Sequence, residues 1–217
     1  MNAKIAMSGI SILSAMAIVV GATYAYFSDS GTSSENVFTA GTLDMQLSNN
    51  NEGFADNVTA TVGGSNMAPG DTFNGDLFVK NSGSTNANHI DLDFTNSVTE
   101  GAGVGSGTTP NFASVLEITA MSWDSDANGS TDTDVLALAA IPDFNSNSIV
   151  DLQDLENVSA TAFRDRVNLP FGGTQSTGHK LHIEGRLNPT LAVSSNQGDS
   201  DSLTIGVFMN QGTHASE

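Results

Sequence analysis

The stretch HIDLDF, residues 89–94, indicates a β-strand, because its apolar and polar residues alternate without a break. In an extended chain the six side chains divide between two faces, with Ile90, Leu92 and Phe94 on one and His89, Asp91 and Asp93 on the other. This period of two is typical of a β-strand with one buried face. It predicts that the first set packs into a core.

The same alternation recurs along the chain, in short segments separated by turns rich in Gly, Asn, Ser and Pro. The segments are residues 37–47, 57–64, 72–83, 114–123, 179–187 and 201–211. Seven or more short strands of this kind predict an all-β fold, an antiparallel β-sandwich. Residues from about 124 to 168 form an acidic insertion between strands. Apolar residues three and four apart predict that this insertion is partly helical.

The first 25 residues have the composition of a secretory signal peptide. They contain no Asp or Glu, one basic residue (Lys4) and an apolar run, and they end in small residues. We expect cleavage after Ala25, with an uncleaved N-terminal anchor as the alternative. The sequence then predicts an N-terminal arm over residues 26–36 and a sandwich domain over residues 37–217. The arm is rich in Ser and begins with two aromatic residues, Tyr26 and Phe27.

The charge balance narrows the possible partners. The chain has 24 acidic and 6 basic residues, a formal net charge of −18. Nucleic acids and anionic lipids are bound through clustered Lys and Arg, so the sequence predicts no nucleic-acid partner and membrane contact only through the leader. A surface this acidic suits divalent cations. The chain has no cysteine, which excludes thiol chemistry and Cys-ligated zinc.

The segment DFNSNSIVDLQD, residues 143–154, has the spacing of a calcium-binding loop. The predicted ligands at positions 1, 3, 5, 7, 9 and 12 are Asp143, Asn145, Asn147, the backbone carbonyl of Ile149, Asp151 and Asp154. Ser148 stands where such loops have Gly. The alternative is an Asn-rich turn followed by a helix that Asp151 caps. A second acidic segment, residues 124–134, matches the first half of a calcium loop and could equally be a solvated hairpin.

The sequence offers little for catalysis. H-E-x-x-H, G-x-S-x-G and Gly-rich phosphate loops are absent, and we therefore expect that the chain is not an enzyme. On a strand His182 and Glu184 would share a face while His179 points away, and we expect both histidines to face solvent. Glycosylation sequons occur at Asn57, Asn128 and Asn157.

Three stretches together resemble the TasA/camelysin family of secreted matrix and fibre proteins. They are the leader and first strand from GATYAYFSDSGTSS to NVFTAGTLDMQL, the segment MAPGDTFNGDLFVKNSGS, and NQGDSDSLTIGVFMNQ near the end. The resemblance implies a jelly-roll sandwich outside the cell or at its surface that forms filaments in a biofilm matrix. It also implies that the arm of one subunit, anchored by Tyr26 and Phe27, adds as a strand to the next after signal peptidase removes the leader. A calcium-dependent monomeric adhesin and a camelysin-like metalloprotease remain the alternatives.

Overall fold

A computed structural model of the protein describes residues 41–59, 62–101, 110–158, 169–171 and 178–212. The predicted leader and the arm with Tyr26 and Phe27 lie outside these residues. The compact unit begins at Gly41 and runs to Glu217. No helix in the described ranges is both long enough and apolar enough to span a membrane.

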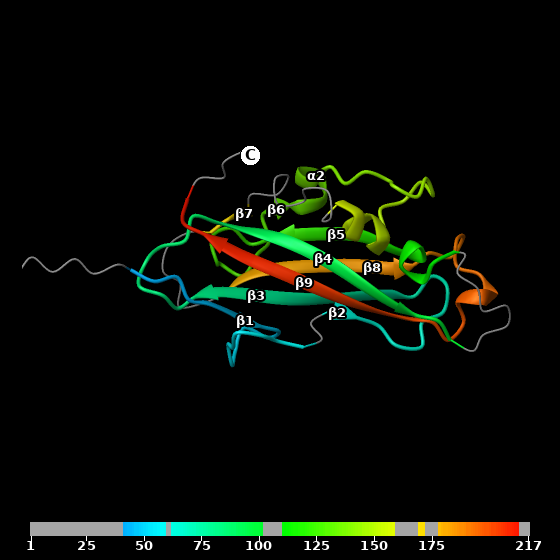
Figure 1. Cartoon of the computed structure of the whole chain (residues 1–217), viewed down its shortest axis with the longest axis horizontal. Coiled ribbons are helices and arrows are strands. Elements are labelled where there is room, and N and C mark those ends of the chain that lie inside the picture. Colours follow the sequence, from blue (N-terminus) through cyan, green and yellow to red (C-terminus); the bar gives the residue numbers. More distant parts are fainter. Residues whose placement is uncertain (1–40, 60–61, 102–109, 159–168, 172–177, 213–217) are drawn as a thin grey trace, which may run out of the picture. The chain divides into compact units, whose positions relative to one another are not determined.

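The described residues form two antiparallel sheets. Sheet A has the order β1-β3-β8-β5-β6, with β2 paired to β3, and sheet B has the order β7-β4-β9. The strands of sheet A are β1 (Met45–Ser48), β2 (Val62–Gly63), β3 (Thr72–Asn81), β5 (Leu116–Trp123), β6 (Thr133–Asp134) and β8 (His179–Leu187). The strands of sheet B are β4 (His89–Thr99), β7 (Leu169–Pro170) and β9 (Ser200–Asn210). The predicted all-β antiparallel sandwich is confirmed, and Figure 1 shows β4 and β9 lying across sheet A.

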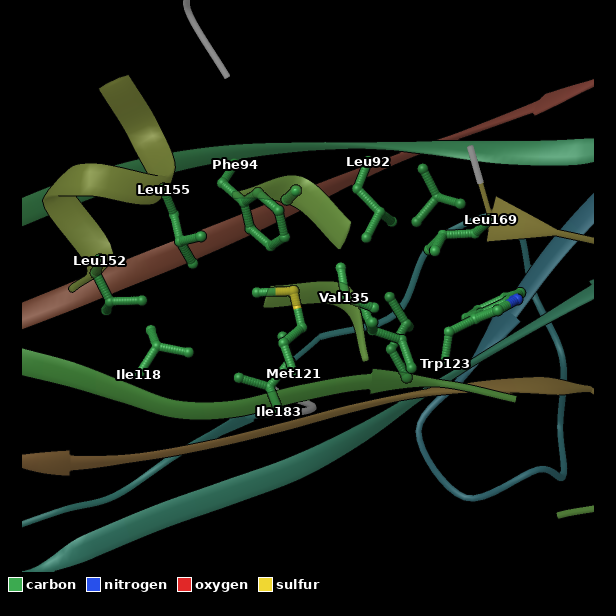
Figure 2. Packing of buried hydrophobic residues seen from close by; sticks show 14 of the residues in the cluster. Leu92, Phe94, Ile118, Met121, Trp123, Val135, Leu152, Leu155, Leu169 and Ile183 are labelled. Carbon is green, nitrogen blue, oxygen red and sulfur yellow. The ribbon is translucent and has the colours of Figure 1, made fainter. Parts of the chain in front are cut away.

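The core lies between the two sheets and follows the predicted alternation. Leu92 and Phe94 of β4 are at most 1 % exposed, and they point toward Met121 of β5 and Ile183 of β8 (Figure 2). The polar face of β4 is less open than expected. His89 and Asp91 retain only 3 % and 7 % exposure, and the side chain of Asn210 donates a 2.6 Å hydrogen bond to Asp91.

Helical structure is short and lies mainly in the predicted insertion. It comprises the 3₁₀ turns η1 (Phe112–Val115) and η2 (Ser194–Asn196), the helix α2 (Val135–Ala139) and a helical stretch at residues 152–158. The strand predicted from residue 114 begins at Leu116 instead. The side chain of Asn111 accepts a hydrogen bond from the Ala113 N–H, and the Ser114 hydroxyl donates to the Asn111 carbonyl. These local bonds favour a helical turn over an extended chain.

Candidate functional site

One edge of sheet B has no strand neighbour within the described ranges. There, β9 pairs with β4 alone, from Ser200 opposite Thr99 to Asn210 opposite His89. A strand paired on one side only leaves a row of N–H and C=O groups on its other side. Within the described ranges, this edge is therefore a candidate position for a further strand.

A groove lies between the sheets at the beginning of β9. Its volume is about 730 Å³. Apolar side chains from both sheets and from the segment around β2 line it, among them Val62, Met67, Phe73, Leu116, Leu187 and Leu203. The groove and the edge of β9 thus offer apolar contacts and backbone hydrogen bonds at the same place.

The groove also contains a carboxyl group. Asp201 lies two residues before Leu203 on β9, so the two side chains share the face that lines the groove. Both carboxyl oxygens of Asp201 are shielded from solvent. Burial raises the pKa of Asp201, and the charge of Glu156 adds to this increase. A ligand of this groove therefore meets apolar side chains from both sheets together with two acidic residues, Asp199 and Asp201.

The loop at residues 143–148 wraps around its first carboxylate. Asp143 accepts hydrogen bonds from the N–H groups of Asn147 (3.1 Å) and Ser148 (2.8 Å). The side-chain oxygen of Asn145 accepts from the Asn147 N–H at 3.1 Å. Ser146 and Ser148 have positive φ angles of 61° and 72°, so Ser148 adopts the left-handed conformation usually supplied by Gly.

The structure brings three of the six predicted calcium ligands together through their side chains. The amide groups of Asn145 and Asn147 donate hydrogen bonds to the same Asp151 oxygen, at 2.9 Å and 2.7 Å. Asp143 is turned to backbone N–H groups, and Ile149 donates its own N–H to the Asn147 side chain. The calcium site stays a prediction.

Asp154, the last predicted ligand, is fully buried beside this cluster. It accepts hydrogen bonds from the N–H groups of Phe144 (2.8 Å) and Asp151 (3.3 Å). Burial is the main reason why its pKa rises to about 6, with further contributions from the charges of Asp151 and Asp143. An ionised carboxylate here is costly unless positive charge is near.

Residues 124–130 repeat the hydrogen-bond pattern of residues 143–149. Asp124 accepts from the N–H groups of Asn128 (3.2 Å) and Gly129 (2.7 Å), and Asp126 accepts from Asn128 at 3.2 Å. Ala127 and Gly129 have positive φ angles, at the positions equivalent to Ser146 and Ser148. Both acidic segments thus adopt the same loop, although only the first was assigned ligands from the sequence.

The 143–154 loop is attached to the elements that line the groove. The Asn147 amide donates to the Ser114 carbonyl at 2.9 Å, and the Ile118 N–H donates to the Val150 carbonyl at 2.8 Å. Leu152, within the loop, is itself a lining residue of the groove. The loop therefore packs against the wall of the groove that η1 and β5 form.

The histidines lie on opposite faces of β8, as predicted. The ring nitrogens of His182 contact the carboxylates of Asp76 and Glu184 on the outer face of sheet A. His179 does not face solvent, contrary to our expectation. It is fully buried, and its ring stacks on Trp123 with a centroid distance of 5.5 Å and contacts Phe171 at 4.0 Å. The signal was present in the sequence, because His179 shares its face with Leu181 and Ile183.

Comparison with known protein families identifies the family of this chain. Residues 1–181 of the 217 match the family described as camelysin metallo-endopeptidase. The chain therefore belongs to the camelysin/TasA family, as the resemblance indicated. At the coarse level this makes it a secreted protein related to biofilm, located outside the cell or at its surface. No curated protein matches the chain.

The prediction that the chain is not an enzyme is wrong, because its family is described by a metallo-endopeptidase activity. The prediction relied on missing motifs such as H-E-x-x-H, which detect only ligands that lie close together on one helix. In a β-sandwich, side chains from distant parts of the sequence meet across strands, as Asp76 and His182 do. A missing motif therefore does not exclude an active site in this fold.

The described residues nevertheless do not fit a catalytic zinc ion. Such an ion has three protein ligands and one open position, and the described ranges contain no group of three or more His, Asp or Glu that could hold a metal, the carboxylates of the 143–154 loop included. His182 has a carboxylate at each ring nitrogen. His89 and His179 are buried.

Proposed function

We propose that this protein is a structural subunit of an extracellular filament, in which the N-terminal arm of each subunit adds as a strand to the next. The observation that supports this most directly is the groove beside the edge of β9 that has no strand neighbour within the described ranges. The family assignment agrees with a secreted protein of a biofilm matrix.

The groove suits an extended peptide with apolar side chains at alternate positions. Backbone groups of the peptide would pair with the edge of β9, and every second side chain would point between the sheets. Tyr26 and Phe27 are the aromatic residues of the arm. Burying an aromatic side chain contributes roughly 1.5–3 kcal/mol, so two anchors favour docking substantially.

This arrangement gives head-to-tail contacts. Each subunit would offer its arm to one neighbour and its groove to another, which leads to an open filament rather than a closed ring. The main partner is thus a second copy of the chain. Removal of the leader by signal peptidase would start assembly, because it frees the arm.

Negative-stain microscopy of two purified forms tests the proposal. One form starts at Tyr26, and the other lacks residues 26–36. We expect filaments from the first and none from the second. Filaments from both forms would show that another surface joins the subunits, and a lack of filaments from either would favour the monomeric adhesin.

A groove variant provides a matched test of the acceptor side. Leu203→Glu places a charge inside the groove, whereas Thr204→Glu places it on the neighbouring exposed position of β9. We expect Leu203→Glu to stop elongation and Thr204→Glu to permit it. Mixing the Leu203→Glu form, which still donates, with the arm-deleted form, which still accepts, should yield dimers that grow no further.

We also propose that the 143–154 loop binds calcium and that the ion stabilises the insertion against η1 and β5. The support is the ligand spacing, the convergence of Asn145, Asn147 and Asp151, and the attachment of the loop to Ser114 and Ile118. When bound, the ion would supply the positive charge beside the buried carboxylates.

The family description supports a second candidate activity, metal-dependent cleavage of peptides. The test is incubation of the purified protein with casein, with and without a chelator. Cleavage that the chelator abolishes would establish the activity. Assembly can be followed in the same samples, so the two functions are distinguished.

A further inference from the structure

His182 joins two central strands of sheet A through its ring. It lies in β8 directly opposite Asp76 of β3, and Glu184 follows two positions later on the same outward face. The ring Nδ1 is 2.5 Å from an Asp76 oxygen, and Nε2 is 2.9 Å from a Glu184 oxygen. The side chain is 27 % exposed, so the contacts are partly shielded from water.

The protonation state of the His182 ring determines how many of these contacts are hydrogen bonds. A neutral imidazole has one N–H donor and one lone pair, whereas a carboxylate only accepts hydrogen bonds. With a carboxylate at each nitrogen, the neutral ring directs its lone pair at one of them. The protonated ring donates to both.

The surrounding charges also favour the protonated form of the His182 ring. Partial burial alone would lower the pKa of His182, but the hydrogen bonds and charges of Glu184 and Asp76 outweigh it and raise the pKa. The Arg186 guanidinium on the same strand is paired with Glu117 of β5. By strand register, the charged and titratable groups of this outward face are Asp76 and Lys80 on β3, Lys180, Glu184 and Arg186 on β8, Glu117 on β5 and Asp134 on β6.

We propose that His182 links β3 and β8 in a pH-dependent way. The protonated ring donates hydrogen bonds to both Asp76 and Glu184, and the link is weaker when the ring is neutral. The proposal does not depend on the filament. Because the pKa of His182 is higher in the folded protein than its ordinary value of 6.5, the stabilisation is complete below that value. It is lost as the pH rises through the folded-state pKa.

The direct test is an NMR titration of the histidine rings of the purified protein, from about pH 5 to about pH 9. The His182 signal is assigned by its disappearance in His182→Gln. We expect His182 to titrate above 6.5, and Asp76→Asn and Glu184→Gln each to lower its pKa. Glu100→Gln, an exposed carboxylate directly after β4 in sheet B, serves as the control and should leave the titration unchanged.

Thermal unfolding provides the second readout. The Tm of the wild-type protein should exceed that of His182→Gln by roughly 2–4 °C in mild acid, and the difference should vanish once the ring is neutral. Titration of His182 at or below 6.5 in the wild-type protein would overturn the proposal. So would a Tm difference that is the same at about pH 5.5 and about pH 8.5.

Discussion

Glu117 shows at the scale of one residue how a side chain connects elements that are far apart in sequence. Its carboxylate accepts hydrogen bonds from Arg186 at 2.7 Å and 3.0 Å and from Asn188 at 2.7 Å. The Arg186 hydrogen bonds are the largest cause of its lowered pKa, and the Asn188 bond adds to them against the opposing effect of burial.

This lowered pKa predicts an acid-dependent loss of stability. An acid whose folded-state pKa is depressed stabilises the fold above its unfolded-state value, 4.5 for Glu117, and loses that contribution as the pH falls through the folded-state pKa. We expect Glu117→Gln to lower the Tm at neutral pH, with a difference from the wild type that shrinks in acid. A difference that does not change with pH would contradict the ion pair as its cause.

Substitution of Phe94 in the core should reduce stability more than substitution of Glu117. Phe94 is 1 % exposed and packs between the sheets (Figure 2). Phe94→Ala leaves a cavity, so we expect a loss of about 3–5 kcal/mol in the free energy of unfolding. Chemical denaturation measures it, with Thr95→Ala on the exposed face of the same strand as the control. A loss below about 1 kcal/mol would mean that Phe94 does not pack as described.

The alternation of residues 89–94 was enough to predict the inward set of β4, because a strand repeats every two residues. It could not predict the burial of Asp91, which depends on Asn210, 119 residues later. The pairing of His182 with Asp76 has the same origin, since 106 residues separate them. Contacts within a short segment can be predicted from its sequence, whereas pairing across strands requires the topology.

At the scale of elements, the 143–154 loop shows the same difference between local contacts, which its sequence predicts, and contacts with distant elements, which it does not. Its ligand spacing and its turn were predictable, since Asp143, Asn147 and Ser148 contact one another within six residues. Its attachment to Ser114 and Ile118 was not, because it depends on how the insertion returns to β5.

Calcium should stabilise the protein if the loop binds it. At a free concentration 100-fold above the dissociation constant, one bound ion adds about 2.7 kcal/mol to the stability of the folded state. We therefore expect calcium to raise the Tm by several degrees, measured by calorimetry. Asp143→Asn, at an exposed ligand position, should reduce the rise, and Asp56→Asn, elsewhere on the surface, should not. An unchanged Tm for the wild type in calcium would refute the site.

At the scale of the whole molecule, charge opposes self-association. Each chain carries a formal charge of −18, so neighbouring subunits repel one another. Salt screens this repulsion, since the Debye length falls from about 30 Å at 0.01 M to about 8 Å at 0.15 M ionic strength.

If filaments form as proposed, their elongation should accelerate over this range of ionic strength, measured by light scattering. The monomer that lacks residues 26–36 is the control and should scatter equally at both concentrations. Slower elongation in salt would indicate that attraction between charges at the contact outweighs the general repulsion.

The chain has a single tryptophan, and the position of that residue gives the protein a built-in optical probe. The Trp123 indole is fully buried, stacks on His179 and donates its N–H to the Pro170 carbonyl at 2.8 Å. All of the indole emission therefore comes from one buried site where β5, β7 and β8 meet. A shift of that emission to longer wavelength will report the opening of this site without any attached dye.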